Sequence, residues 1–122
     1  ELNLERVAKK VIELSKRLRC NLTAKHYIYG FKVTPKITVE KVMKRYLKDS
    51  IYNYFSKKQN VIYEANCGQE ISQFCHALVY LSRKLNKPIK AKHNQKVFEV
   101  YPSDNFRDAV ERWSDSKLYD DH

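Results

Sequence analysis

The sequence is poor in the two residues that most often interrupt regular structure: its 122 residues contain two glycines and three prolines. Long loops and low-complexity linkers are therefore not expected. The sequence has no apolar run near the roughly 18 residues of a membrane span, and its N-terminus lacks a signal-peptide pattern. The cysteine count is odd (Cys20, Cys67 and Cys75), so the three cannot all pair within the chain. This count favours a reducing, cytoplasmic location.

The common catalytic motifs are also missing. There is no glycine-rich phosphate loop, no HExxH helix and no nucleophile elbow. Cys67, Cys75 and His76 are close in sequence, but their spacing is not that of a zinc finger. The sequence therefore predicts no metal, no cofactor and no enzymatic activity. The weaker alternative is a metal-independent nuclease that uses His26 and His93 for acid–base chemistry.

Acidic residues are scarce in the first half of the chain. Residues 1–60 hold 15 Lys and Arg against 5 Asp and Glu, whereas residues 61–122 hold 9 of each. The composition, with 43% apolar and 31% charged residues, is that of a globular protein, and the length suits a single domain spanning residues 1–122. Such an uneven distribution of charge between the two halves indicates an anionic partner that binds in a defined orientation.

The chain resembles itself at an offset of 67 residues. Residues 14–46 align with residues 81–113 without a gap, and ten of the 33 pairs are identical, where chance would give about two. In each of the two aligned segments, the spacing of apolar residues predicts one helix at the beginning and another at the end. The sequence thus predicts repeats at roughly 3–56 and 70–117, joined by residues 57–69. The helix that follows the first pair of strands is expected over residues 38–56, and a short strand is expected at Ile62 and Tyr63.

Each predicted repeat has the order helix, strand, strand, helix. Leu22, Ala24 and His26 alternate with polar residues, as do Ile89, Ala91 and His93, which is the period of a half-buried strand. We therefore expect an α+β fold made by tandem duplication of this α-β-β-α unit. Its two hairpins would form one antiparallel sheet packed by helices, with pseudo-two-fold symmetry. Thr38 and Ser103 are the expected N-caps of the helices that follow the hairpins.

The Ala-Lys-His triplet occurs twice and supplies two kinds of candidate. By alternation, His26 and His93 face the apolar side, either as satisfied residues at the end of a strand or as the lining of a shared pocket. The lysines face the opposite side, where they could meet phosphate groups. The predicted residues for binding nucleic acid or another anion are Arg17, Lys25, Tyr27, Lys32, Lys41, Lys44, Lys48, Lys90 and Lys92.

Two functional hypotheses follow from this surface. The first is a non-enzymatic protein that binds RNA or single-stranded DNA, because lysines and arginines interleave with tyrosines on which unpaired bases stack. The alternative is a small inhibitor or sequestering protein, of a kind that phages and mobile elements encode. It would bind an acidic host protein surface or an anionic nucleotide signal. The apolar face of the first predicted helix could form a homodimer with a second copy of the chain. Packing of the same face within the chain is the alternative explanation.

Overall fold

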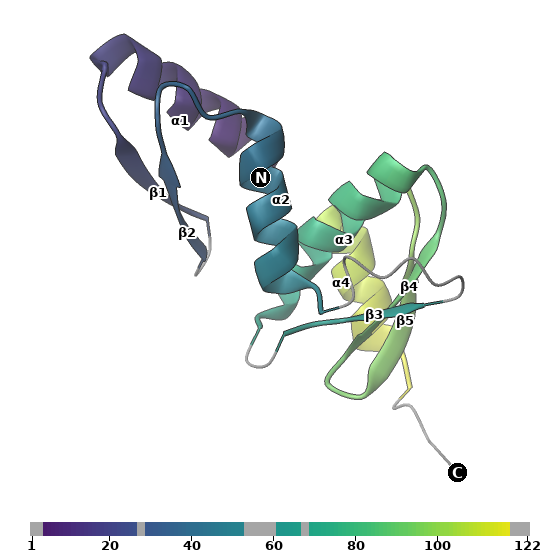
Figure 1. Cartoon of the computed structure of the whole chain (residues 1–122). Coiled ribbons are helices and arrows are strands. Elements are labelled where there is room, and N and C mark those ends of the chain that lie inside the picture. The colour runs from purple at the N-terminus through teal and green to yellow at the C-terminus, as the bar shows by residue number, and fades with distance from the viewer. Residues whose placement is uncertain (1–3, 27–28, 53–60, 67–68, 118–122) are drawn as a thin grey trace. The chain divides into compact units, whose positions relative to one another are not determined.

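The computed structural model describes residues 4–26, 29–52, 61–66 and 69–117. Over these residues the chain is an α+β protein with four helices and two small sheets (Figure 1). It divides into two compact units, Glu1–Tyr46 and Leu47–His122, called unit 1 and unit 2 below. Among the described residues, no helix has the length and the apolar character that crossing a bilayer requires.

Unit 1 consists of a helix, a hairpin and the start of a second helix. Its elements are α1 (Leu4–Leu18), β1 (Leu22–His26), β2 (Tyr29–Val33) and α2 (Val39–Ser50), the last of which continues into unit 2. The hairpin is antiparallel and pairs Leu22 with Val33 and His26 with Tyr29. Its two-residue connection, Tyr27 and Ile28, lies outside the described residues.

The core of unit 1 follows from the apolar periods of these elements. Helix α1 buries residues at a spacing of three to four, namely Leu4, Ala8, Ile12 and Ser15. Phe31 and Val33 alternate with the exposed Lys32 on β2. The ring of Tyr46, on α2, is fully buried and packs edge-on against Tyr29, with ring centroids 4.8 Å apart. Burying a side chain of this size stabilises the fold by about 1.5–3 kcal/mol.

Unit 2 contains the remaining strands and helices. They are β3 (Ile62–Glu64), α3 (Ile71–Leu85), β4 (Ile89–His93), β5 (Lys96–Val100) and α4 (Phe106–Asp115). β4 is the central strand: β3 pairs with it in parallel and β5 pairs with it antiparallel. Asn94 and Gln95 connect β4 to β5 with φ of 48° and 64°, as a two-residue hairpin turn requires.

Helix α3 forms the centre of the core of unit 2. It buries Phe74, Leu78 and Leu81 along one side, and neighbouring positions are buried as well. Phe74 meets Phe98 of β5 edge-on, with ring centroids 6.4 Å apart. The face of the sheet that carries Ala91 and Phe98 is therefore covered, and the opposite face carries Lys90, Lys92 and their paired acidic residues.

The predicted single sheet is wrong. The two hairpins belong to different sheets, one with two strands and one with three. The edge of β4 that another hairpin could have joined is paired with β3 instead. The predicted short strand at Ile62 and Tyr63 thus exists, and its pairing with β4 is what the sequence did not reveal.

Two predicted boundaries are also corrected. The helix expected over residues 38–56 ends at Ser50, and Ile51 forms an isolated antiparallel bridge with Ala65. Helix α4 is capped by Asn105 and not by Ser103, through a reciprocal pair of hydrogen bonds with Asp108. A capping box of this kind satisfies two backbone N–H groups that would otherwise lack partners.

Corresponding elements of the two units begin 67 residues apart. This holds for α1 and α3, β1 and β4, β2 and β5, and α2 and α4. Hydrogen bonds correspond as well: the Ser15 hydroxyl donates to Cys20 O, and the Ser82 hydroxyl donates to Lys87 O. The residues that end the first helix of each unit, Arg19 and Asn86, have φ of 54° and 52°.

Candidate nucleic-acid interface

A groove on unit 1 collects basic side chains from β2, the following turn and α2. Its volume is about 690 Å³. Five of its lining residues are Lys or Arg and one is acidic; the lining consists of Lys32, Thr34, Lys36, Ile37, Thr38, Glu40, Lys41, Lys44 and Arg45. We call this the basic groove. Because one carboxylate cannot balance five cations, the basic groove is a site of positive potential.

The local fold explains why these cations point outward. On β2, Lys32 lies between the buried Phe31 and Val33, so alternation places it on the exposed face. On α2, Val42, Met43, Tyr46 and Leu47 are buried. Lys41, Lys44 and Arg45 therefore lie on the opposite side of the helix.

The turn that joins β2 to α2 is held by backbone and side-chain hydrogen bonds. The Ile37 N–H donates to Thr34 O over 3.2 Å, and the Lys41 N–H donates to the hydroxyl of Thr38 over 3.2 Å. Thr38 thus caps α2 as expected. The turn brings Lys32 and Lys41, nine positions apart in sequence, to the same groove.

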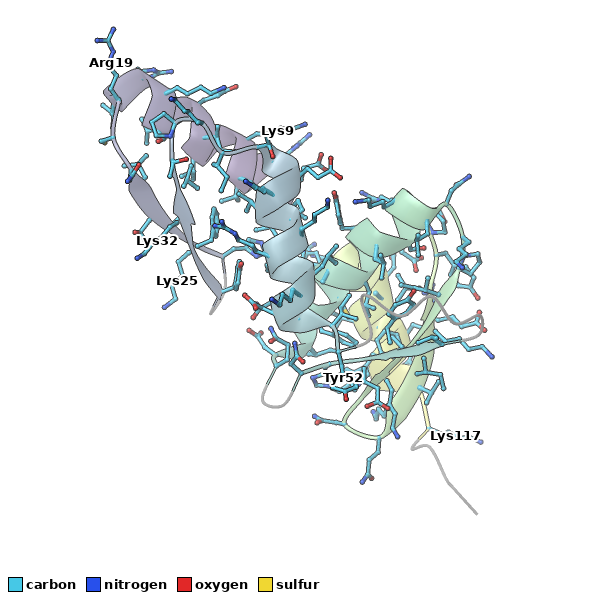
Figure 2. The ribbon with its side chains drawn as sticks, viewed as in Figure 1. Lys9, Arg19, Lys25, Lys32, Tyr52 and Lys117 are labelled. Atoms are coloured by element: carbon cyan, nitrogen blue, oxygen red, sulfur yellow. The ribbon has the colours of Figure 1, made fainter. Side chains whose placement is uncertain are left out.

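Lys25 extends the positive surface beyond the groove. On the hairpin, Lys25 pairs with Gly30 and Thr23 pairs with Lys32. All four are exposed, and the two lysines are diagonal neighbours on this face, which carries no acidic residue. Figure 2 shows both lysines on the hairpin.

Three further predicted residues do not line the groove. Arg17 is exposed in the last turn of α1. Lys48 is exposed one helical turn beyond Lys44 on α2, past the point where unit 2 begins. Tyr27 lies outside the described residues.

Lys90 and Lys92 lie on β4 in unit 2, where acidic residues face them. The strand register places Lys90 opposite Glu99 of β5 and Lys92 opposite Glu64 of β3. Opposite charges on paired strands attract each other and reduce the net potential of the face. Lys25, Lys32, Lys90 and Lys92 were expected to share a basic sheet surface. The positive potential is stronger around Lys25 and Lys32 in unit 1, because no acidic residue is paired with them.

The two histidines are both buried, His26 in unit 1 and His93 in unit 2. His26 packs edge-on against Tyr46, with ring centroids 6.1 Å apart. His93 packs edge-on against Trp113 at 5.4 Å. Each ring is thus one member of an aromatic cluster in its own unit.

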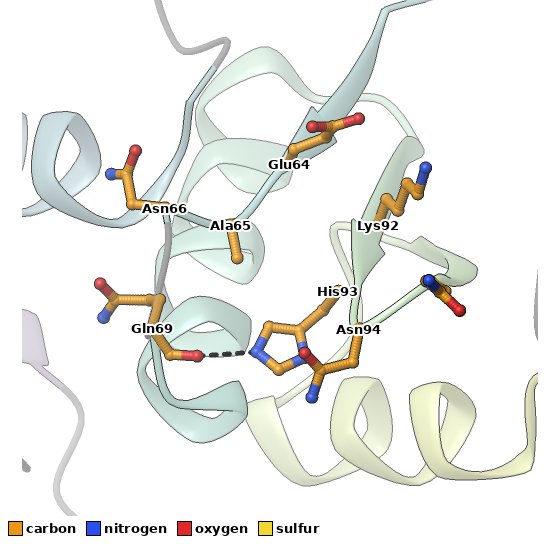
Figure 3. A pocket seen from close by; sticks show the side chains of 8 residues that line it. Glu64, Ala65, Asn66, Gln69, Lys92, His93 and Asn94 are labelled. Carbon is orange, nitrogen blue, oxygen red and sulfur yellow. Dashed lines mark hydrogen bonds between the residues drawn. The ribbon is translucent and has the colours of Figure 1, made fainter.

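A second hollow, of about 460 Å³, lies beside His93 in unit 2 (Figure 3). His93 Nε2 is 2.7 Å from Gln69 O. Because a carbonyl only accepts, Nε2 carries the proton that is donated. The lining also includes Glu64 and Lys92, together with several amide side chains. This hollow therefore lacks the charge imbalance of the basic groove.

The remaining candidates in the described part of the chain are the cysteines and any cluster of metal ligands. Within it, no three His, Cys, Asp or Glu side chains are grouped closely enough to hold a metal ion. Burial raises the pKa of the Cys75 thiol to about 12, so this cysteine is an inert core residue. Cys20 is exposed, and Cys67 lies outside the described residues.

The sequence prediction missed two basic residues of the groove, Lys36 and Arg45. Lys36 lies in the turn after Pro35, and Arg45 is one of the identities at the 67-residue offset. The signal that could have found them is their position on either side of the start of α2. The comparison with known proteins adds nothing to this geometry: no model of a protein family matches the sequence, and no curated protein or solved structure is significantly similar to it.

Proposed function

We propose that this chain is a non-enzymatic nucleic-acid-binding protein whose unit 1 contacts the phosphates of RNA or single-stranded DNA. The observation that carries the proposal is the basic groove, which is lined by five Lys and Arg residues and one Glu. Unit 1 as a whole holds twelve Lys and Arg against four Asp and Glu, a net charge of +8.

A surface of this kind suits a polyanion for a thermodynamic reason. Each phosphate that a Lys or Arg neutralises releases condensed counterions into solution, and this release favours binding. Lysines, arginines and threonine hydroxyls are common ligands of the nucleic-acid backbone. Lys25 and Lys32 would extend the contact from the groove across the hairpin face, while Arg17 supplies further charge in unit 1 and Lys48 supplies it on the part of α2 that belongs to unit 2.

Exposed aromatic surface favours unpaired strands over duplexes. Tyr52 follows α2 and is 72% exposed (Figure 2). Stacking of a base on a tyrosine ring contributes about 1–3 kcal/mol per base and does not depend on sequence. Tyr46, by contrast, is buried in the core and unable to stack on a ligand.

The role of Lys90 and Lys92 is smaller than the sequence indicated. Their cross-strand neighbours Glu99 and Glu64 offset their charge. We therefore place the phosphate contacts on unit 1 and expect little from the sheet of unit 2.

We also infer that the chain arose by tandem duplication of an α-β-β-α unit. Ten identities in 33 aligned positions and four pairs of elements that begin at the same offset support this inference. The pseudo-two-fold relation of the two copies stays a prediction. On this basis the copies have diverged in charge, because unit 2 has a net charge of only +2.

The test is a fluorescence-anisotropy titration of the full chain. The probes are labelled single-stranded RNA, single-stranded DNA and duplex DNA, each at about 50 and about 200 mM salt. We expect the single strands to bind more tightly than the duplex, and all binding to weaken strongly at the higher salt. Absence of binding to all three probes at the lower salt would refute the proposal.

The same titration separates the alternative of an inhibitor or sequestering protein. Such a protein would bind an acidic protein surface or a small anionic nucleotide with a fixed one-to-one stoichiometry. Its affinity would depend weakly on salt, because few phosphates would be neutralised. Competition by unlabelled mononucleotide, without competition by oligonucleotide, would favour it.

A further inference from the structure

The junction between the second strand and the following helix is built in the same way in both units. In unit 1 the Ile37 N–H donates to Thr34 O over 3.2 Å, and in unit 2 the Asp104 N–H donates to Tyr101 O over 3.0 Å. Thr38 accepts from the N–H of Lys41, and Asn105 accepts from the N–H of Asp108. Each pair of corresponding residues is 67 positions apart, so side chains can be compared position by position.

In unit 2 this junction contains an ion pair that the chain supplies to itself. The carboxylate of Asp104 accepts from Arg112 through both oxygens, at 2.6 and 3.2 Å, and from the Tyr101 N–H at 2.8 Å. Asp104 is only 6% exposed. An arginine fork and a backbone N–H that converge on two oxygens form a typical oxyanion site, and here Asp104 fills it.

In unit 1 the arginine is present and the carboxylate is not. Arg45 corresponds to Arg112, whereas Ile37 takes the position of Asp104. Both residues line the basic groove. Among the residues that the structure describes, the side chain of Arg45 makes no hydrogen bond or ion pair.

Other acidic positions of unit 2 correspond to lysines in unit 1. Glu99, Asp108 and Glu111 correspond to Lys32, Lys41 and Lys44, all of which line the groove. The one change in the opposite direction is Arg107, which corresponds to Glu40. In unit 2 the junction thus contains the carboxylate of Asp104, whereas in unit 1 the corresponding junction is lined by cations.

We propose that the basic groove holds a phosphate oxyanion beside Ile37 and against Arg45, where it supplies the counter-charge that the Asp104 carboxylate gives to Arg112 in unit 2. The inference rests on the proposed function in one respect: the phosphate is taken to belong to a nucleic-acid strand. A phosphate presents two oxygens to the guanidinium as a carboxylate does. The Thr34 N–H corresponds to the Tyr101 N–H and supplies a further donor, while Lys32, Lys41 and Lys44 serve the neighbouring phosphates.

The first arm of the test rebuilds the internal anion. Ile37→Asp introduces the carboxylate that unit 2 has at this position, and Ile37→Asn removes the same apolar contacts without adding charge. Asn21→Asp adds one negative charge at an exposed position outside the groove. We expect Ile37→Asp to weaken binding of single-stranded RNA by about tenfold, as loss of one strong charge-assisted contact would. The two control variants should each change it by no more than about threefold.

The second arm observes the arginine directly by NMR. Inorganic pyrophosphate is added to the full-length chain while the Nε–Hε signals of its arginines are followed, and Arg45→Lys and Arg112→Lys identify the two signals of interest. We expect pyrophosphate to shift the signal of Arg45 and to leave that of Arg112 in place, because Arg112 is already held by Asp104.

The outcomes distinguish the subsite from the wider proposal. If pyrophosphate shifts Arg45 while no oligonucleotide binds, the phosphate subsite stands and the nucleic-acid proposal fails. If RNA binds but Ile37→Asp behaves like Ile37→Asn and the Arg45 signal does not move, the subsite is wrong and the nucleic-acid proposal survives. Circular dichroism of each variant checks that it is folded.

Discussion

The arginine that corresponds between the two units has two different environments. Arg112 lies over the ring of Tyr101 at 4.8 Å, donates to Glu99 O at 2.8 Å and forms the ion pair with Asp104. Arg45 lies in the basic groove with cations around it. A partly buried arginine that is paired with a carboxylate stabilises the fold, whereas an unpaired one among like charges is available to a ligand. We therefore assign Arg112 to stability and Arg45 to binding.

The ion pair also makes the stability of the chain depend on pH. Burial raises the pKa of Asp104, but the hydrogen bonds from Arg112 and the Tyr101 N–H outweigh burial and hold the pKa below its ordinary value. A carboxyl group with a lowered pKa stabilises the folded state above its pKa in the unfolded chain, about 3.9. This stabilisation is lost as the pH falls through the lower, folded-state pKa.

Replacement of Asp104 tests this account of the ion pair. Asp104→Asn should lower the free energy of unfolding by about 2 kcal/mol at neutral pH, because Arg112 loses its counter-charge. The difference from the wild type should shrink toward pH 3. Urea unfolding at pH 7 and pH 3 measures both values. Asp115→Asn, at an exposed position of α4, is the control and should stay within about 0.5 kcal/mol of the wild type. An equal loss at both pH values would contradict the assignment.

Helices α1 and α3 are each followed by a residue in the left-handed conformation, and this conformation is unfavourable for the residue that follows α1. Arg19 and Asn86 both have left-handed φ after the last residue of α1 and α3. Asparagine tolerates this conformation and glycine tolerates it best, whereas a long side chain such as arginine is strained there by about 1 kcal/mol. The end of α1 is therefore less favourable than that of α3.

This strain predicts a stabilising substitution. Arg19→Gly should raise the free energy of unfolding by about 0.5 kcal/mol, with a smaller gain for Asn86→Gly. Arg17→Gly makes the same chemical change two residues earlier, inside the helix, and should lower stability by about 0.5–1 kcal/mol. Urea midpoints of the three variants provide the comparison. If Arg19→Gly and Arg17→Gly both destabilised the chain to the same extent, the left-handed end of α1 would be wrong.

Elements whose signals are local could be predicted well from the sequence. The three-to-four spacing of apolar residues located α1 and α3, and the alternation around Ala24 and Ala91 located β1 and β4. These patterns depend only on which face of one element meets the core. The Asn94–Gln95 turn is equally local, because asparagine tolerates the positive φ that it has there.

Pairing between strands could not be predicted in the same way. The partner of β4 on its second edge is β3, which precedes it by a whole helix. Nothing in the pattern of Ile62 and Tyr63 distinguishes a parallel partner from an antiparallel one. Glu64 of β3 and Glu99 of β5 offset the charges of Lys92 and Lys90. Only the strand register shows that these residues are paired, so the weaker positive potential around the two lysines could not be predicted.

For the whole chain, counting charges located the excess of basic residues, but it did not show which of these residues lie together. Lys32, Lys41 and Lys44 were predicted only as separate anion-binding candidates, and the structure places all three in the lining of the basic groove. Lys36 and Arg45 join them because the turn from Thr34 to Ile37 folds the strand back toward the helix. Such a grouping depends on the path of the chain and not on composition.

The salt dependence of RNA binding tests the central claim most directly, because it counts neutralised phosphates. Lys41→Gln with Lys44→Gln removes two charges from the basic groove, and Lys90→Gln with Lys92→Gln removes two from the sheet of unit 2. We predict that the first pair reduces the slope of log affinity against log salt by about 1.4, at about 0.7 per phosphate contact on a single strand, and that the second pair leaves it unchanged. Equal slopes for the two double variants, or a larger change for the pair in unit 2, would contradict the assignment of binding to the basic groove.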